Sequence, residues 1–323
     1  MKLLIAFTLV IITSTASFAE RVRTVIPRAT LNYLSVPVAE VKGFFRDENL
    51  ENETITIPGS TAIAALVSGE VDYSGAGGTG MRAALRGAPI KCVMFQTEKV
   101  TWYLIAAPEI AKAADLKGKR VAVGTVGDTQ DALITAYAER NGVAPRDLIR
   151  VAMASRSTTT TILGLKSGAI QAATVNGDEA LIAEKEGLRT LAFLGDLFPY
   201  PFQGFMASDK KIAERPGDVK RWLRAMMRSL MFIRERPEEA ADIAMNKIPM
   251  RNPSRPIVIE GIRRFVRALP DGIPGVPSAQ GLKNVVEFDV KAPLKIKEEV
   301  APEKFLALKL AAEVKEELER KAR

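Results

Sequence analysis

The stretch GSTAIAALVSGEVDYS at residues 59–74 reappears in altered form as TTTTILGLKSGAIQAATV at residues 158–175. The two align when Ser68-Gly69 is placed on Ser167-Gly168. Each copy starts with hydroxyl side chains that suit a helix N-cap, continues as an apolar helix, stops at a glycine suited to a left-handed cap, and runs into a strand. The repeat predicts two α/β lobes of related design. Two unrelated helix–strand units with common caps remain the alternative.

Strands and helices alternate around both copies, which is typical of mostly parallel sheets covered on both faces. In the first series the expected strands are 21–26, 54–57, 71–74 and 90–96, and the expected helices are 35–45, 61–68 and 79–86. In the second series the strands are 120–123, 148–152, 170–175 and 189–194, and the helices are 129–141, 158–167 and 178–187. Residues 101–107 form an extended link between the series, and nearly everything from residue 209 onward is expected to be helical.

The first 19 residues are typical of a cleaved secretory signal. Lys2 precedes an apolar run at residues 3–12, and Ser17-Phe18-Ala19 supplies small residues at the −3 and −1 positions. The run is shorter than the roughly 20 residues that span a bilayer. We expect a mature chain that begins at Glu20 and works in the periplasm, with no lipid attached because no cysteine lies near the cleavage point. An uncleaved anchor is the alternative.

The composition excludes several kinds of chemistry. Of 323 residues, 47% are hydrophobic and 26% are charged, as in an ordinary folded protein. The chain has no histidine and one cysteine, Cys92. A Ser-His-Asp triad, a histidine-ligated metal and an intrachain disulfide are therefore impossible, and we expect no cofactor and no metal. The net charge is +8, but positive and negative residues are interleaved, so no nucleic-acid partner is expected.

The glycine-rich segment GAGGTG at residues 75–80 superficially resembles a dinucleotide-binding loop. The acidic residue that such a loop requires about 20 positions further on would have to be Glu98, which lies at the end of an expected strand, so the spacing does not support dinucleotide binding. Glycines before a helix still allow a ligand to approach the backbone closely, and free N–H groups there attract hydrogen-bond acceptors. Gly78 and Thr79 are therefore candidate ligand contacts. A tight turn without any ligand is the alternative.

The other candidate residues lie on loops or helix starts where open α/β sheets bind ligands, at the carboxyl ends of the strands. For Arg28, Thr129 and Ser157, a rim position or a helix cap is the competing role, and for the aromatic residues it is core packing. Ser60 and Thr61 either contact the ligand or cap their helix. The full set of candidates is Arg28, Tyr33, Ser60, Thr61, Gly78, Thr79, Trp102, Asp128, Thr129, Ser157, Asn176, Asp178 and Phe202.

Four short motifs resemble a known family. They are EVKGFF at 40–45, ALVSGEVD at 65–72, RGAPIK at 86–91 and DLKGKRVAV at 115–123. Together they resemble the periplasmic substrate-binding proteins of nitrate/sulfonate/taurine-type ABC importers, with the thiamine-pyrimidine-synthesis-like domain, over roughly residues 22–215.

This resemblance implies a type II periplasmic binding protein fold. Such a fold has two lobes, with two mostly parallel sheets flanked by helices and a C-terminal helical extension. The ligand would lie between the lobes, which two extended strands near 101–107 and 202–207 would connect. The implied division is a first lobe at 20–106, a second at 107–204, and a return to the first lobe with C-terminal helices at 205–323.

The resemblance also implies a function. We expect a monomer that captures a small polar or aromatic ligand, of the sulfonate, carboxylate or pyrimidine-like kind, and delivers it to an ABC permease. The family includes enzymes that use histidine and a cysteine-rich iron motif, and this chain has neither, so no catalytic residue is expected. Two alternatives stay open: an exported enzyme using carboxylates such as Asp128 and Asp178, and a ligand adaptor for a sensor.

Overall fold

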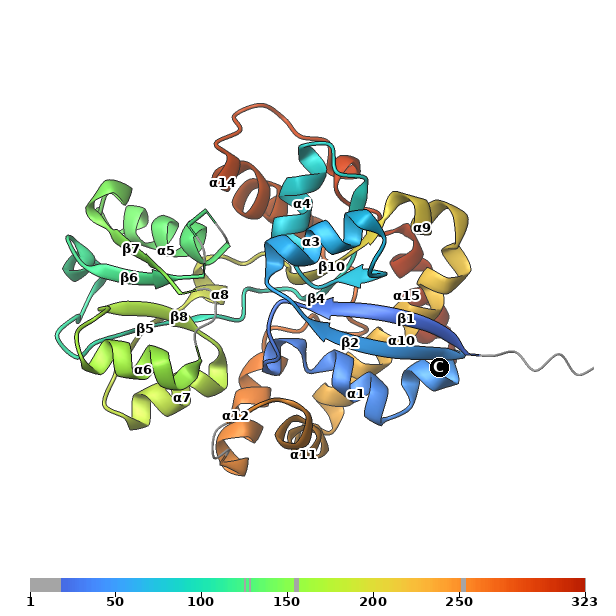
Figure 1. Ribbon diagram of the computed structural model, residues 1–323, viewed down its shortest axis with the longest axis horizontal. Helices are drawn as coiled ribbons and strands as arrows, with labels where there is room; N and C mark the ends of the chain where they lie inside the picture. The colour runs from blue at the N-terminus through green and yellow to red at the C-terminus, as the bar shows by residue number, and fades with distance from the viewer. Residues whose placement is uncertain (1–18, 125, 128, 154–156, 251–253, 323) are drawn as a thin grey trace, which may run out of the picture.

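Two five-stranded sheets form two lobes that lie side by side (Figure 1). The structure is a computed structural model that describes residues 19–124, 126, 127, 129–153, 157–250 and 254–322. Nearly all of the expected signal segment lies outside these residues. Within them, no helix is both long and apolar enough to span a membrane.

The first sheet has the strand order β2-β1-β3-β10-β4. These strands are β2 (Leu50–Thr56), β1 (Glu20–Ile26), β3 (Tyr73–Ser74), β10 (Phe202–Ser208) and β4 (Ile90–Thr97). β1 pairs in parallel with β2 and β3, whereas β10 runs antiparallel to both of its neighbours. The antiparallel strand of this sheet, β10, is therefore the one that the chain enters directly from the second lobe.

The second sheet repeats this plan in the order β7-β6-β8-β5-β9. Its strands are β7 (Ile149–Ala152), β6 (Arg120–Val123), β8 (Ala172–Val175), β5 (Tyr103–Ala106) and β9 (Arg189–Phe193). β5 is antiparallel to β8 and β9 and arrives from the first lobe. The chain crosses between lobes from β4 to β5 and from β9 to β10, so each sheet is mixed and its antiparallel strand is a crossing strand.

The internal repeat occupies equivalent places in the two lobes. Helix α3 (Gly59–Ser68) leads into β3, and α6 (Thr158–Lys166) leads into β8, each the middle strand of its sheet. Gly69 and Gly168 end the helical turns with φ of +81° and +72°, which confirms the predicted left-handed stops.

The predicted hydroxyl cap of the first copy is wrong. Helix α3 begins at Gly59, with Pro58 as its N-cap, and no side chain caps it. Ser60 and Thr61 therefore lie within the first turn rather than before it. In the second copy the prediction holds, because the Ser157 hydroxyl accepts a hydrogen bond from the Thr160 backbone N–H.

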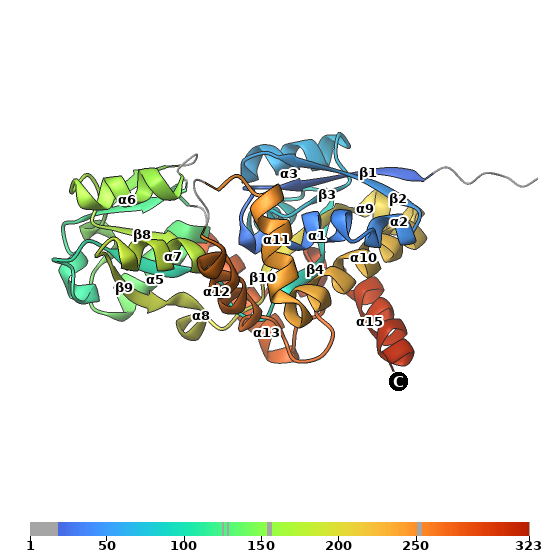
Figure 2. The same ribbon diagram turned by 90° about the horizontal axis from the view of Figure 1, so that it is seen from below.

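Helices cover both faces of each sheet (Figure 2). The first lobe and the C-terminal part contain α1 (Ser35–Val41), α2 (Phe44–Asp47), α3, α4 (Gly77–Leu85), α9 (Asp209–Glu214), α10 (Pro216–Glu235), α11 (Pro237–Lys247), α12 (Arg255–Val266), α13 (Ala279–Asn284), α14 (Ala292–Leu294) and α15 (Lys309–Ala322). The second lobe contains α5 (Thr129–Arg140), α6, α7 (Gly177–Lys185) and α8 (Leu194–Leu197). A π-helical segment at Val285–Lys291 precedes α14.

Successive residues of β1 face opposite sides of the first sheet, as the pleat requires. On β1, Val22 and Ile26 pack with α1, α10 and α11, while Val25 packs with α3. Trp222 of α10 is fully buried, stacks on Tyr73 with ring centroids 4.0 Å apart, and donates a hydrogen bond to the Thr24 hydroxyl. These contacts pack the C-terminal helices against the first sheet. They therefore help to position the ends of its strands.

Candidate functional site

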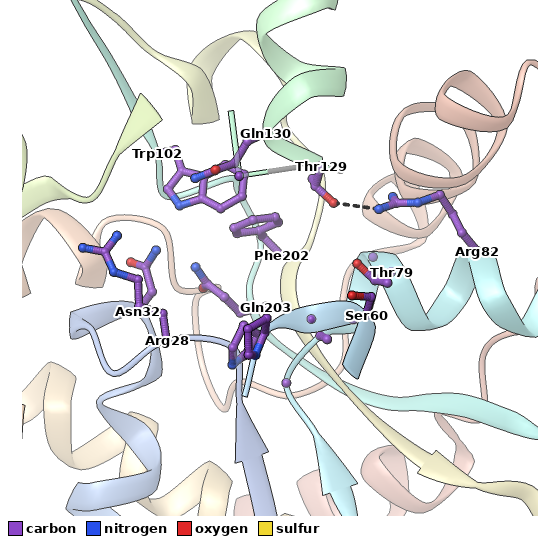
Figure 3. Close-up of a pocket in the computed structure, with 18 of the residues that line it drawn as sticks. Arg28, Asn32, Ser60, Thr79, Arg82, Trp102, Thr129, Gln130, Phe202 and Gln203 are labelled. Atoms are coloured by element: carbon purple, nitrogen blue, oxygen red, sulfur yellow. Dashed lines mark hydrogen bonds between the residues drawn. The ribbon is translucent and has the colours of Figure 1, made fainter. Parts of the chain in front are cut away.

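A cavity of about 490 Å³ lies between the two sheets (Figure 3), within the range of small-molecule sites. It is found where parallel strands end, because Arg28 follows β1, Gly75 follows β3 and Asn176 follows β8. The crossing strands run the opposite way, so their beginnings reach the same place. Trp102 precedes β5, and Phe202 opens β10.

Most of the residues proposed from the sequence line this cavity. The structure brings together Arg28, Tyr33, Ser60, Gly78, Thr79, Trp102, Thr129, Asn176 and Phe202. The topology explains this result, since each of them lies at the cavity edge of a sheet.

Three proposed residues lie elsewhere, which corrects the placement expected of them. Thr61 is exposed on the outer side of α3, because that helix starts earlier than expected. Ser157 is exposed and caps α6. Asp178 packs against α12, where a β-carbon built on Gly261 would lie 2.6 Å from that of Asp178. Asp128 falls outside the described residues.

The aromatic side chains form one wall of the cavity. Trp102 and Phe202 meet edge to face, with ring centroids 4.6 Å apart and an interplanar angle of 73°. Figure 3 shows both rings facing the cavity between the lobes. Tyr33 donates a hydrogen bond from its hydroxyl to the Gly75 carbonyl at 2.9 Å. The wall therefore offers an apolar surface against which a flat ring can stack.

The first turns of α3 and α4 form a second, polar wall. Neither helix has a side-chain cap, and Gly59, Ser60, Gly77 and Thr79 all line the cavity. The N–H groups of a first turn have no partner within the helix and carry partial positive charge. This wall therefore suits hydrogen-bond acceptors.

Close packing accounts for the glycine-rich segment. A β-carbon on Gly77 would lie 2.6 Å from the Gly204 carbonyl oxygen, and one on Gly75 would lie 2.7 Å from the Tyr33 ring. Glycine is therefore required at both positions by neighbouring protein atoms, without any dinucleotide.

At one edge of the cavity, Arg28 and Asn32 of the first lobe form hydrogen bonds to residues of the second lobe. Arg28 donates to Glu179 Oε1 at 2.5 Å, and Asn32 donates through its side-chain amide to Asn176 Oδ1 at 2.5 Å. Burial raises the pKa of Glu179, but Arg28, the Asn176 backbone N–H and the Thr158 hydroxyl together hold it below its usual range. Glu179 is therefore an ionised partner of Arg28 at neutral pH.

The opposite edge is built around Arg82 of α4. Its guanidinium donates to Asp289 Oδ1 at 2.9 Å, to the Asp289 carbonyl at 2.8 Å, and to the Thr129 hydroxyl of α5 at 3.2 Å. The side chains of Arg82 and Asp289 are only 6% and 3% exposed. Burial raises the pKa of Asp289, and Arg82 and Thr129 oppose that rise. The C-terminal segment thus supplies a buried carboxylate beside the cavity.

Asp178, in the first turn of α7, lies just outside the cavity and packs against α12. Its Oδ1 is buried without a hydrogen-bond partner. Burial, with the neighbouring Glu179 carboxylate, raises the pKa of Asp178 to about 7, although backbone N–H groups and Arg28 oppose the rise. Arg264 of α12 packs over Gly177, one residue earlier. This carboxyl group therefore titrates near neutrality at the contact between lobes.

The sequence analysis missed several lining residues, among them Asn32, Arg82, Gln130, Gln203, Pro293 and Leu294. Asn32 and Gln203 are adjacent to the proposed Tyr33 and Phe202, so the argument from strand ends also predicts that they lie near the cavity. Pro293 and Leu294 have no such signal in the sequence, because only tertiary packing brings the C-terminal segment to the cavity.

A two-lobed α/β architecture with a cavity between its lobes is the periplasmic binding protein fold, as the structural comparison also shows. The chain resembles the Escherichia coli periplasmic aliphatic sulphonate binding protein SsuA with a TM-score of 0.69 and 16% identity. The likeness covers 89% of this chain and 92% of that one. Residues 31–240 match the family model described as NMT1/THI5 like, and the chain belongs to that family. The resemblance and the fold class inferred from the sequence are confirmed.

Two curated relatives share low sequence identity with this chain. The riboflavin-binding protein RibY of Chloroflexus aurantiacus is 25% identical over 225 residues, 66% of this chain and 62% of that protein. The 4-amino-5-hydroxymethyl-2-methylpyrimidine phosphate synthase of Candida albicans is 27% identical over 230 residues, 64% of this chain and 65% of that protein. The chain thus spans less than two thirds of the length of either relative.

Proposed function

We propose that this protein is an extracytoplasmic solute-binding protein that captures a small polar or aromatic organic ligand and delivers it to an ABC permease. One observation carries the proposal: the cavity is lined from both lobes, and the residues that line it also form hydrogen bonds across the gap. Asn32 with Asn176, and Arg82 with Thr129, each join the two lobes at the cavity. A ligand held there would contact both lobes at once.

The two walls support a ligand that combines a ring with acceptor groups. The edge-to-face pair of Trp102 and Phe202 offers stacking, and the first turns of α3 and α4 offer N–H donors. The names of a riboflavin-binding relative and a sulphonate-binding structural neighbour agree with a solute-binding role. The expected leader at residues 1–19 supports a periplasmic location, in which the protein would act as a monomer.

An enzyme is the competing class, and one relative is named as a synthase. The described residues that line the cavity include no aspartate, glutamate or cysteine. Asp178 lies outside the cavity, and Cys92 is buried in the first sheet with its thiol pKa raised by desolvation. These observations favour binding over acid–base or nucleophilic catalysis.

Native mass spectrometry of the protein purified from a periplasmic fraction tests the proposal. We expect a chain that begins at Glu20 and carries a noncovalent small molecule, which collisional activation releases intact. Solution scattering should then show a smaller radius of gyration with the released ligand than without it. Conversion of the recovered molecule to a product by the purified protein would contradict a purely binding role, and an unchanged radius at saturation would contradict closure.

A further inference from the structure

Two of the three arginines that line the cavity are already paired with carboxylates of the protein. Among the described lining residues the cationic side chains are Arg28, Arg82 and Arg86. Arg28 is paired with Glu179 and Arg82 with Asp289, whereas Arg86 is exposed at the rim. Neither carboxylate belongs to the cavity lining. Away from the rim, the cavity therefore presents the Arg28 and Arg82 guanidinium groups without their net charge.

Asp289 also lies where an anion would bind at the start of α4. A β-carbon on Gly78, in the uncapped first turn of α4, would lie 2.7 Å from Asp289 Oδ2 and 2.7 Å from the Thr129 hydroxyl. The carboxylate thus lies against both the guanidinium of Arg82 and a helix N-terminus. These two features together favour an anionic group, and the C-terminal segment supplies that group from within the chain.

A second anion in this cavity would meet like charge. An anionic group near Arg82 would lie within a few ångströms of Asp289 in a site of low dielectric constant, and it would lose its hydration without gaining an unpaired cation. A carbonyl or hydroxyl oxygen avoids this repulsion. It still accepts hydrogen bonds from the free N–H groups of α3.

From these contacts we infer that the cavity selects ligands that are uncharged where they meet the first lobe, and that Asp289 is the specificity-determining residue that excludes sulfonates and carboxylates there. The inference rests on the proposed function and narrows it. Asp289 acts through Arg82 rather than by touching the ligand. Ligands of this kind carry amide, carbonyl or hydroxyl oxygens on an aromatic ring.

Matched pairs of probes test the inference in the mature protein. Nicotinamide with nicotinate, benzamide with benzoate, and benzenesulfonamide with benzenesulfonate differ in charge but hardly in shape. Dissociation constants are measured by calorimetry and by ligand-observed nuclear magnetic resonance at constant ionic strength. We expect the neutral member to bind at least about tenfold more tightly, which corresponds to about 1.4 kcal/mol. Equal or tighter binding of the anionic members overturns the inference.

Two variants assign the effect to Asp289. Asp289→Asn leaves the Arg82 charge uncompensated, so benzenesulfonate should gain about tenfold or more in affinity relative to benzenesulfonamide. Arg82→Gln combined with Asp289→Asn removes both charges and should restore the preference for the neutral probe. Glu186→Gln, which removes a carboxylate from an exposed pair with Lys166, controls for net charge and should change nothing. An unchanged preference in Asp289→Asn refutes the role of this residue.

Free sulfate gives a second readout that does not depend on an organic probe. Sulfate should stabilise Asp289→Asn saturably in thermal melts and have no such effect on the wild type or the double variant. Saturable stabilisation of the wild type by sulfate contradicts the inference and leaves solute binding intact. If no organic probe of either charge binds and no ligand co-purifies, the proposed function itself fails.

Discussion

The helices that begin at the cavity in the first lobe differ from their counterparts in the second lobe. Helices α3 and α4 start without side-chain caps. Their counterparts α6 and α7 occupy the same places in the repeat, but Ser157 caps α6. At α7 a capping box joins Glu179 to the N-cap residue Asn176, whose backbone N–H donates to the Glu179 carboxylate. The same supersecondary unit thus has side-chain caps at its helix N-termini in the second lobe and lacks them in the first.

This difference shows how a duplicated unit divides two tasks. A capped helix start contributes stability and has few donors left for a ligand. An uncapped start keeps its N–H groups for whatever enters the cavity, at some cost in stability. The first lobe therefore holds helix starts with free N–H donors, whereas the helix starts of the second lobe are already capped.

The largest expected effect concerns the ion pair beside the uncapped start of α4. Asp289→Ala leaves Arg82 buried and unpaired, so we expect it to lower the free energy of unfolding by about 3–5 kcal/mol. The combination Arg82→Met with Asp289→Leu removes both charges and should recover most of that loss. Urea denaturation measures both variants. A loss in the double variant as large as in the single one would show that the pair matters through shape rather than charge.

The carboxylate-rich start of α7 should make stability depend on pH. Asp178 has an ordinary pKa of 3.8 and a folded pKa of about 7, so the folded protein retains a proton that the unfolded chain releases. Its contribution is fully present below pH 3.8 and is lost as the pH rises to about 7, with a slope of at most about 1.4 kcal/mol per pH unit. The pKa of Glu179 is lowered by Arg28 and by hydrogen bonds to its carboxylate, so its stability contribution has the opposite sign and is lost as the pH falls.

Asp178→Asn checks this assignment. Stability measured by urea denaturation from about pH 5 to pH 8 should fall less steeply in the variant than in the wild type. Parallel curves for the two proteins would place the pH dependence elsewhere in the chain.

The smallest effects separate the two copies of the repeat directly. Ser157→Ala removes the cap of α6 and should cost about 1 kcal/mol of stability with ligand affinity unchanged. Ser60→Ala removes a hydroxyl from the cavity and should leave stability nearly intact, while affinity for the co-purified ligand falls by up to about tenfold. Thr61→Ala, on the exposed side of α3, is the matched control and should change neither.

Thermal melts and calorimetric titration measure both quantities on the same samples. If Ser60→Ala lowers the melting temperature and Ser157→Ala weakens binding, the division of tasks between the two copies is reversed.

The sequence predicted the fold well because periodicity reports burial directly. The short, almost continuous apolar runs at 120–123 and 172–175 are strands buried on both faces. The glycines at 69 and 168 end helices because glycine adopts φ near +80° without strain. The candidate site followed from one further step, that parallel strands end at a common edge. That step needs no knowledge of side-chain contacts.

The remaining features depend on distances in space that periodicity does not carry. Arg82 reads as an ordinary solvated charge in a helix, and only the packing of the segment at 285–291 buries it against Asp289. Ser60 and Ser157 both resemble N-cap residues in the sequence, yet a helix that starts at Gly59 places Ser60 inside its first turn. The loop between β7 and α6 contains residues 154–156, which lie outside the described part of the chain.

The position of β10 determines the order in which the lobes can be completed. In the first sheet β10 lies between β3 and β4 and joins them by hydrogen bonds. The strands that end before residue 98 therefore cannot form one sheet until β10, which ends at Ser208, has been synthesised. The second sheet uses only residues 103–193 and is continuous in sequence. The lobe that leaves the ribosome first therefore folds last, because its closure requires pairing between distant segments.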